Sequence, residues 1–436
     1  MLLCLLSACS PGDGTPAIAD AQPLRWGPVA TVTDEGAHAV VSTAASPQDD
    51  GLRALVTMRI TDFSPTQFSH HVRAFVSRDS SASWQDSSLP AVPGATHSAG
   101  ASVAFSPSGV LYVAHSVRSA EERGSQVAVH RSRDGGRTWG LTTVIPVRVA
   151  DTPKISIDQD GVVYVSIYDR ADDPLLGRPA SDRGWAIVVA TSRDEAESFE
   201  LTSVTFDNDL TLGVYNVVTF SDGNPWLAFS QFSSDPATRT SNLYGLGSFP
   251  LSISVADVDH VAELGRRIPR MANAAVDGGS RFVDRLYVAY SVGPSDSLVT
   301  AVVRSDDRGR SWFAPTTLSA PSGGHHSRLP RVAVHESGVV GIAWLQTEAE
   351  SDRCWRIHFA YSVDGGASFS EPNPVSANPS CPDTIDELGT NQGLRRFYGF
   401  GGDYMGLAAT EGGFQIAWTD LSAGRLEIRT RQVETG

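Results

Sequence analysis

The sequence has little of what would indicate a metal centre, a nucleotide site or a helical fold. Only four of its 436 residues are cysteines, and no Cys-x-x-Cys pair or Cys/His spacing suits zinc. No Gly-rich phosphate loop and no Gly-x-Ser-x-Gly elbow precedes a helix-like segment. No long stretch has the periodicity of an amphipathic helix. These absences exclude zinc-finger, P-loop and serine-hydrolase classes, and we expect neither a metal nor a cofactor.

Charge is also scarce and unbalanced. Charged residues make up 19% of the chain, and the formal net charge is −15. An acidic surface repels nucleic acid and anionic membranes, so we expect neither as a partner. Glycine (40) and proline (25) are abundant, which favours many short strands joined by turns, and 41% hydrophobic residues are ample for a core.

The cysteines fall into two groups. The apolar run Met1–Cys9 is too short to span a bilayer, and its Leu-Ser-Ala-Cys ending resembles the bacterial lipobox, in which the cysteine is lipidated after cleavage. The run has no basic n-region, which suggests that the true start lies further upstream or that the start was assigned too late. We therefore expect a signal segment at 1–8, lipidation of Cys9, a flexible tether at 9–24 and one domain at 25–436, in an exported lipoprotein of the bacterial envelope.

The other two cysteines, Cys354 and Cys381, lie in the body of the chain. A single pair in an exported protein indicates a disulfide, and we expect it to pin the loop 378–394.

One short motif is repeated five times. Its pattern is Ser-x-Asp-x-Gly-x-Ser/Thr-Trp/Phe, and the copies are Ser77–Trp84, Ser132–Trp139, Ser192–Phe199, Ser305–Trp312 and Ser362–Phe369. Two copies are degenerate, with Ser81 and Ala196 at the glycine position. The pattern closely resembles the Asp box, or bacterial neuraminidase repeat, of the sialidase-like β-propellers, and the copies together cover nearly all of the body.

This resemblance implies an all-β propeller in which the motifs are hairpin turns on the face away from the active site. Asp and Ser side chains bond turn amides, glycine supplies positive φ, and the aromatic residue packs between neighbouring sheets. The five motif aspartates therefore have no catalytic role: Asp79, Asp134, Asp194, Asp307 and Asp364.

A second repeating unit gives the number of blades. Pairs of strands joined by a glycine-containing turn begin near seven positions, roughly 40–70 residues apart: Ala37, Ala95, Asp151, Val214, Arg267, Arg328 and Tyr398. We expect seven blades, with six as the alternative. The fourth unit is expected to lack its third strand and motif. The seventh ends after its third strand, 425–431, and the segment 26–32 is expected to close the ring as its outer strand.

Propeller ligands usually bind at one end of the central channel, where the inner strands begin. These starts are rich in cations, which predicts a site for an anionic sugar because Arg binds carboxylates in a bidentate manner. The candidate ligand-binding residues are Arg267, Arg270, Arg328, Arg331, Lys154, Arg396 and His97. In the alternative interpretation, these charges pair with Asp151 and Asp403 as structural links between blades.

The resemblance also suggests a catalytic set. Sialidases use an early Arg-Ile-Pro, an acid/base Asp and a Tyr nucleophile assisted by a Glu. Here Arg-Ile-Pro occurs at 267–269, in the fifth unit, and Glu35-Gly-Ala-His stands in the first. The candidates are Tyr404 or Tyr398 as nucleophile, Glu387 as its base, and Asp151 or Asp403 as acid.

Two functions remain open from the sequence. One is an exported sialidase-like propeller that acts on or binds extracellular glycans, with exo-sialidase or other glycoside hydrolase activity. The other is a non-catalytic surface propeller that binds a protein or polysaccharide, including a scaffold for an envelope complex. For either function we expect a monomer that meets the membrane only through its N-terminal lipid.

Overall fold

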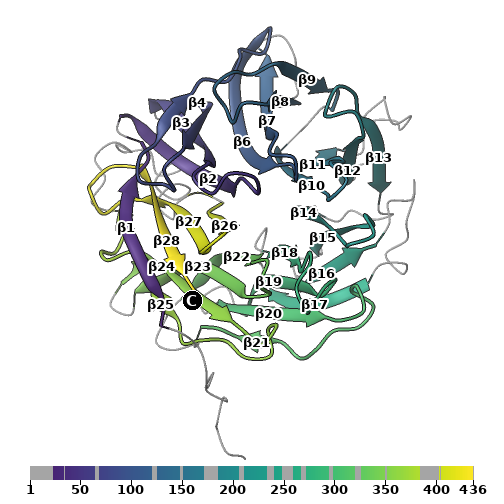
Figure 1. Cartoon of the computed structure of the whole chain (residues 1–436), viewed down its shortest axis with the longest axis vertical. Coiled ribbons are helices and arrows are strands. Elements are labelled where there is room, and N and C mark those ends of the chain that lie inside the picture. The colour runs from purple at the N-terminus through teal and green to yellow at the C-terminus, as the bar shows by residue number, and fades with distance from the viewer. Residues whose placement is uncertain are drawn as a thin grey trace, which may run out of the picture.

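The computed structural model describes residues 23–33, 35–63, 68–119, 125–147, 151–170, 185–205, 211–232, 240–247, 259–266, 272–293, 298–319, 326–348, 351–382, 402 and 404–435. These residues form 28 strands in seven four-stranded antiparallel sheets, and none of the described elements is an α-helix. The sheets stand in a ring, as the blades of a propeller (Figure 1).

The first three blades follow the chain in order. Blade 1 comprises β2 (Ala37–Ala45), β3 (Arg53–Phe63), β4 (Phe68–Ser77) and β5 (Gln85–Ser87). Blade 2 comprises β6 (Ala95–Phe105), β7 (Leu111–Ser119), β8 (Gln126–Ser132) and β9 (Leu141–Ile145). Blade 3 comprises β10 (Asp151–Ile157), β11 (Val163–Arg170), β12 (Trp185–Ser192) and β13 (Glu200–Thr205).

The next three blades have the same strand order. Blade 4 comprises β14 (Thr211–Thr219), β15 (Pro225–Phe232), β16 (Thr240–Leu246) and β17 (Asp259–Arg266). Blade 5 comprises β18 (Ala272–Val276), β19 (Leu286–Val292), β20 (Val299–Ser305) and β21 (Thr316–Thr317). Blade 6 comprises β22 (Ser327–Val334), β23 (Val340–Glu348), β24 (Ser351–Ser362) and β25 (Asn373–Pro374).

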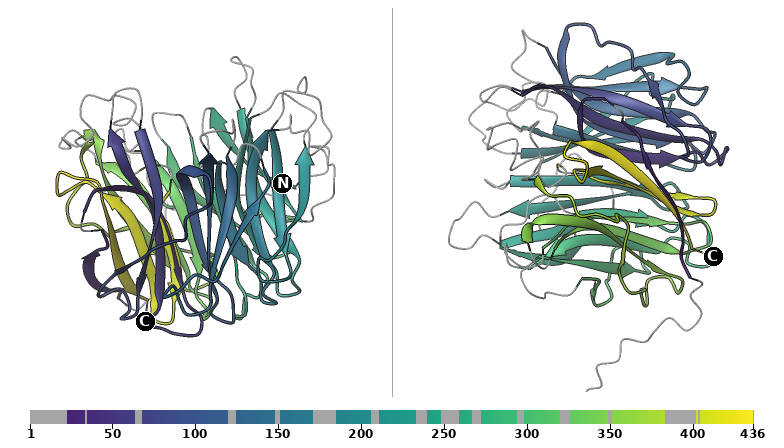
Figure 2. Two further views of the ribbon diagram at one scale, coloured as in Figure 1. Left: turned by 90° about the horizontal axis from the view of Figure 1, so that it is seen from above. Right: turned by 90° about the vertical axis from the view of Figure 1, so that its left-hand side faces the viewer.

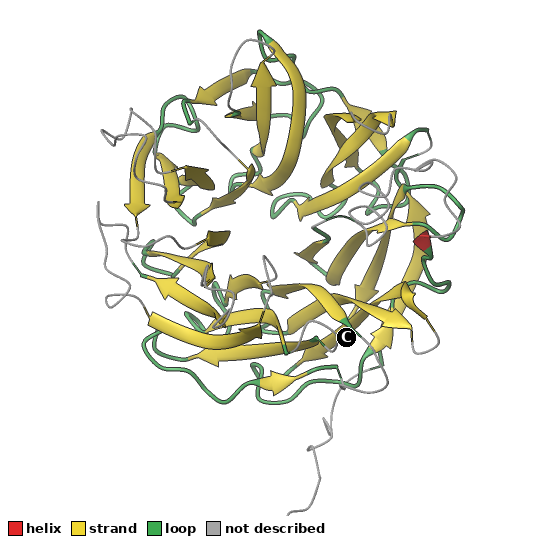
Figure 3. Ribbon diagram, turned by 180° about the vertical axis from the view of Figure 1, so that it is seen from behind, coloured by secondary structure: helices red, strands yellow, loops and turns green. Residues whose placement is uncertain are grey.

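Blade 7 joins the two ends of the described chain. It contains β26 (Gly406–Thr410), β27 (Gly413–Asp420), β28 (Glu427–Glu434) and, as its outer strand, β1 (Arg25–Thr31). The β1–β28 pairing aligns Trp26 with Val433 and Ala30 with Thr430. Both the seven-blade count and the closure of the ring by terminal strands are confirmed, and the six-blade alternative is wrong. Views from the side and from behind show the blades stacked around the ring (Figures 2 and 3).

The fourth blade differs from the sequence-based expectation, because its third strand is present. This strand is β16, which pairs with β15 from Leu246↔Leu227 to Ser241↔Phe232. Gly245 interrupts its apolar pattern for a steric reason: a Cβ at this position would lie 2.0 Å from the ring of Trp226. The glycine that hides the strand in the sequence is therefore required by its packing.

The hydrophobic core lies between adjacent blades. One cluster joins strands of blades 1 and 2 around Val56, Val76 and Val113, with the motif residue Trp139 packed against it. Phe199 packs similarly against the cluster shared by blades 2 and 3. The aromatic residue that ends each motif therefore packs between sheets, as predicted.

The five motif segments, hereafter the repeat turns, share one set of hydrogen bonds. In Ser132–Trp139, the Ser132 hydroxyl donates to Asp134 Oδ1 at 2.8 Å and accepts from the Gly136 N–H at 2.8 Å. The Thr138 hydroxyl donates to Asp134 Oδ2 at 2.6 Å. The fifth position has positive φ in every copy, including the non-glycine residues Ser81 (72°) and Ala196 (68°). The turn-forming role predicted for the aspartates is confirmed.

Candidate functional site

Bulges in the inner strands aim side chains at the centre of the ring. The register of β10 shifts between Asp151 and Lys154, and that of β22 shifts between Arg328 and Arg331. Proline lacks the N–H that a ladder needs and is tolerated at bulges, and Pro153 and Pro330 lie within these two. The x-Pro-Lys/Arg pattern seen in the sequence therefore marks a bulge followed by a cation.

The inner strands enclose a central cavity of about 220 Å³. All seven blades contribute to its wall. Its polar lining consists of Lys154, Arg331, Tyr404, Asn216, Asn273, Ser102, Ser42 and Thr43. The described lining thus contains two cations and no carboxylate, which favours an anionic or strongly polar ligand.

Three predicted site residues meet in this cavity. Lys154 Nζ lies 3.2 Å from the centroid of the Tyr404 ring, and the Arg331 guanidinium carbon lies 5.5 Å from the same centroid. Both cations interact favourably with the electron-rich face of the ring. Arg331 Nε also donates to the Met405 carbonyl at 2.8 Å, which fixes the guanidinium between blades 6 and 7. Residues from blades 3, 6 and 7 therefore form one cationic cluster at a tyrosine.

Sequence reasoning missed the neutral polar residues of the cavity. Asn216 Oδ1 accepts from the Ala274 N–H at 3.0 Å and from Asn273 Nδ2 at 3.0 Å. Asn273 Oδ1 in turn accepts from the Val332 N–H at 2.9 Å. These bonds link blades 4, 5 and 6 side by side. Their only signal in the sequence is an Asn within an otherwise apolar inner strand.

A hydroxyl makes the corresponding link between blades 2 and 3. Ser102 Oγ donates to the Pro153 carbonyl at 2.9 Å and accepts from the Ile155 N–H at 2.8 Å. The backbone on both sides of Lys154 is thereby fixed to the neighbouring blade. These two hydrogen bonds therefore hold the Lys154 backbone in a fixed position at the cavity wall.

Two other predicted residues lie apart from the described cavity wall. Arg328 precedes the β22 bulge and is half-buried, and burial lowers the pKa of its guanidinium. His97 lies between the two register shifts of β6, stacks on His71 with a centroid separation of 6.4 Å, and contacts the Thr96 hydroxyl at 2.9 Å. Ser102 and Val103, which follow the second shift between Ala99 and Ala101, are the described residues of this strand that line the cavity.

Several predicted residues fall outside the described part of the chain. They are Asp403, Tyr398, Glu387, Arg267, Arg270, Arg396 and Cys9. The backbone of Asp151 pairs with Tyr168 in blade 3, but its side chain is not described. The roles assigned to these residues stay predictions.

The repeat-turn aspartates lie at the other end of the blades. Each turn joins the third and fourth strands, so in an antiparallel sheet it lies opposite the end where the inner strand begins. Hydrogen bonds from Ser198 and Ser192 hold the pKa of Asp194 down to about 2, and the equivalent bonds from Ser311 and Ser305 do the same for Asp307. These carboxylates are fixed as acceptors within their turns.

The predicted disulfide between Cys354 and Cys381 is present. It lies beside a backbone bridge between Trp355 and Ser380. The disulfide and this bridge together tie the segment that contains Ser380 and Cys381 to β24. Among the described residues, no group of three or more His, Cys, Asp or Glu side chains is placed to hold a metal ion. No helix in the described part of the chain is long and apolar enough to cross a membrane.

No family model matches the chain, and no curated protein is significantly similar to it. Among solved structures, a protein of unknown function from Dyadobacter fermentans is 10% identical, with a TM-score of 0.51 over 95% of this chain and 99% of its own. The Hadza microbial sialidase Hz136 is 14% identical, with a TM-score of 0.46 over 84% of this chain and 73% of its own. An ulvan lyase is 11% identical, with a TM-score of 0.49 over 91% of this chain and 94% of its own. At 10% identity the similarity to the Dyadobacter protein is one of fold alone, and the activities of the sialidase and the lyase are those of these two proteins.

Proposed function

We propose that this chain is an exported propeller that engages extracellular glycans, and that its central cavity binds an anionic sugar. The observation that carries this proposal is the cluster of Lys154 and Arg331 over Tyr404. Ammonium and guanidinium groups bind carboxylate and sulfate, and Asn216 and Asn273 are suited to hydroxyl groups of a sugar.

The net charge of the chain and the volume of its central cavity together favour a small anionic ligand. A net charge of −15 repels polyanions from the surface in general, whereas the two cations of the cavity attract negative charge locally. A cavity of about 220 Å³ suits one sugar unit at the end or branch of a chain better than a long segment. The resemblance of the repeat turns to the Asp boxes of sialidase-like propellers points to the same ligand class.

The finer proposal is a glycoside hydrolase of the sialidase-like type. In this reading Tyr404 is the nucleophile, with Tyr398 as the alternative, Glu387 is its base, and Asp403 or Asp151 is the acid. Tyr404 is supported by its place in the cavity beside both cations. The rival is a propeller that binds the glycan without cleaving it.

Export is supported by the disulfide, because such bonds persist in oxidising compartments. Lipidation of Cys9 and a monomeric state are part of the same proposal.

Hydrolysis of a panel of fluorogenic glycosides, headed by a sialoside, tests the catalytic proposal. Wild type is compared with Tyr404→Phe and Lys154→Met, and with Arg25→Met as a control, since Arg25 is an exposed arginine at the start of the outer strand β1. We expect turnover in wild type and the control, and a loss of at least a hundredfold in both cavity variants. Absence of turnover across the panel would reject the hydrolase in favour of the binding propeller.

A further inference from the structure

The repeat turns of blades 3 and 6 each contact an arginine of the preceding blade. Arg131 of β8 and Arg304 of β20 hold equivalent places, because each directly precedes the first turn serine of its own blade and pairs in register with a tyrosine. Arg131 Nη1 donates to the carbonyl of Glu195, the fourth residue of the next turn, at 2.8 Å. Arg304 Nη1 reaches the equivalent carbonyl, that of Gly365, at 3.5 Å. The joint between blades 2 and 3 is therefore a template for the joint between blades 5 and 6.

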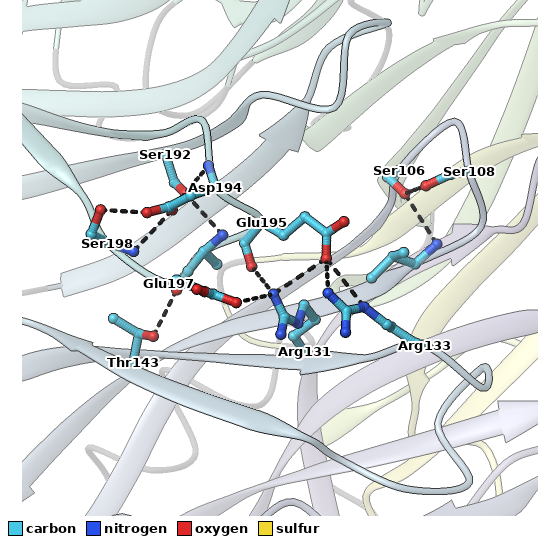
Figure 4. Close-up of polar contacts among 12 residues, drawn as sticks. Ser106, Ser108, Arg131, Arg133, Thr143, Ser192, Asp194, Glu195, Glu197 and Ser198 are labelled. Atoms are coloured by element: carbon cyan, nitrogen blue, oxygen red, sulfur yellow. Dashed lines mark hydrogen bonds and ion pairs between the residues drawn. The ribbon is translucent and has the colours of Figure 1, made fainter.

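Two carboxylates pair with the arginine in the first of these joints. Arg131 Nη1 lies 3.3 Å from Glu195 Oε2 and 3.5 Å from Glu197 Oε1. Figure 4 shows both glutamates bonded to Arg131. At the same two turn positions, blade 6 has Gly365 and Ala367. The positions that neutralise the arginine in one joint thus carry no carboxylate in the other.

A cavity of about 170 Å³, hereafter the joint cavity, lies between blades 5 and 6. Arg304 lines it from blade 5, and Ala367 lines it from blade 6. All of its wall residues belong to the continuously described stretches 272–293, 298–319 and 351–382. The described wall therefore contains one cation and no carboxylate, at the place where the template joint has two glutamates.

The outer strand of blade 5 contributes to this opening. β21 has two residues where β9 has five, and Pro315, which has no N–H, directly precedes it. Thr316 has the strand position of Thr143, because each pairs with the valine two residues before the arginine. The Thr143 hydroxyl donates to the Ala196 carbonyl of the next turn at 2.6 Å, whereas Thr316 lines the joint cavity.

The wall of the joint cavity also includes an exposed aromatic ring. Phe313 takes the place of Gly140, because the N–H of each donates to the carbonyl of the respective arginine at 3.0 Å. The Phe313 side chain is 48% exposed, and its ring centroid lies 4.4 Å from the Arg304 guanidinium carbon. Such a pair offers apolar surface to the C–H groups of a sugar ring and charged donors to a carboxylate on that ring.

We infer that the joint cavity binds an acidic sugar, whose carboxylate pairs with Arg304 and whose ring packs against Phe313. The ligand's carboxylate replaces those that Glu195 and Glu197 supply in the template joint. A volume of about 170 Å³ suits a single sugar unit. The site lies at the repeat-turn end of the blades, away from the central cavity, and it rests on the proposed function only in the choice of a sugar as the carrier of the carboxylate.

Methyl β-glucuronide is the probe, and methyl β-glucoside is its neutral parent; both are titrated by saturation-transfer difference NMR. The full chain carries Lys154→Met and Arg331→Met, which remove both cations of the central cavity. We expect saturable binding of the glucuronide and about tenfold weaker binding of the glucoside, which has no carboxylate. Arg304→Met on this background should weaken glucuronide binding about tenfold, as expected for the loss of a charge-assisted hydrogen bond.

A second variant fills the site from within the chain. Ala367→Glu places a carboxylate where the template turn has Glu197, so it should pair with the arginine of the joint and weaken glucuronide binding about tenfold. The matched control is Ala82→Glu, the same substitution at the same position of the first repeat turn, where Gln432 is the contact from the preceding blade. Both alanines are exposed, and the control should leave the affinity unchanged.

The inference is overturned if the central-cavity variant shows no saturable binding of glucuronide, or if Arg304→Met or Ala367→Glu binds as tightly as that variant. It is also overturned if Ala82→Glu weakens binding as much as Ala367→Glu. Wild type separates the two proposals. Equal glucuronide binding with and without the central substitutions would count against the central cavity alone, whereas complete loss of binding on their introduction would count against the joint cavity alone.

Discussion

At the scale of the residue, two buried histidines, His115 and His130, affect the stability of the fold at low pH. The His115 and His130 rings share a hydrogen bond of 2.8 Å between their Nε2 atoms. His115 Nδ1 donates to the Ser116 carbonyl, so its Nε2 accepts from His130, whose Nδ1 accepts from the Thr142 hydroxyl. Burial lowers the pKa of His115 to about 4 and, together with the charge of His115, that of His130 to about 3. Both rings are therefore neutral in the folded chain near pH 7.

This pair predicts a loss of stability in acid. Both histidines have folded pKa values below the unfolded value of 6.5, so the unfolded chain binds more protons once the pH falls below that value. The free energy of unfolding should fall by up to about 1.4 kcal/mol per pH unit for each ring between pH 6.5 and about 4. Urea titrations at several pH values measure this slope.

The control for the acid effect replaces both rings with glutamine, which does not titrate. The doubly substituted chain should have a shallower dependence on pH than wild type, whatever its stability at pH 7. An unchanged slope would contradict the assignment.

Gly245 offers a second prediction at the scale of one residue. A Cβ there would lie 2.0 Å from the Trp226 ring, which is fully buried, so the ring or the strand must move. Gly245→Ala should lower the free energy of unfolding by about 1–3 kcal/mol. Gly140→Ala is the control, because a Cβ at Gly140 meets no atom within 4 Å. Equal unfolding midpoints for the two variants would refute this account of the strand.

At the scale of the strand, the ring of blades is closed by β1, which pairs with β28 near the other end of the sequence. β1 covers the edge of β28, and Arg431 donates to the Gly27 carbonyl at 2.9 Å. Without β1, the backbone groups along that edge would be free to pair with another chain.

Deletion of residues 1–31 should therefore lower the melting temperature and cause self-association, as measured by light scattering during size-exclusion chromatography. Deletion of residues 1–22 removes only sequence that precedes the described chain and leaves β1 intact. It should behave as the full chain does. A monomeric, equally stable chain after the longer deletion would show that β1 does not close the ring.

Strand patterns in the sequence predicted most of this architecture, because the blades repeat apolar strands joined by glycine-containing turns and five of the seven also contain a motif aspartate. The strand β16 was not predicted, because Gly245 breaks its apolar pattern. The reason for this glycine is its packing against Trp226, which lies on another strand. The asparagines of the cavity escaped for a related reason: Asn216 and Asn273 bond laterally to the next blade, and no single-strand pattern contains that partner. Lys154 and Arg331 were found because both follow a proline at an equivalent bulge.

At the scale of the whole molecule, the central cavity differs in charge from the chain as a whole. The chain has a net charge of −15, yet the described wall of its central cavity contains two cations and no carboxylate. Toward the opposite end of blades 3 and 4, the described lining of another cavity contains four carboxylates, those of Asp158, Asp160, Glu200 and Asp222, and one cation, Arg193.

A glycan array of matched pairs tests the central claim most directly. Each pair sets a sialylated, uronate-containing or sulfated oligosaccharide against its neutral parent, and the protein is applied as wild type, as Lys154→Met/Arg331→Met and as Arg25→Met. The account predicts that wild type and Arg25→Met bind acidic members over their neutral parents at least tenfold, and that the double variant loses this preference. Equal binding of acidic and neutral members by wild type, or an unchanged preference in the double variant, would contradict it.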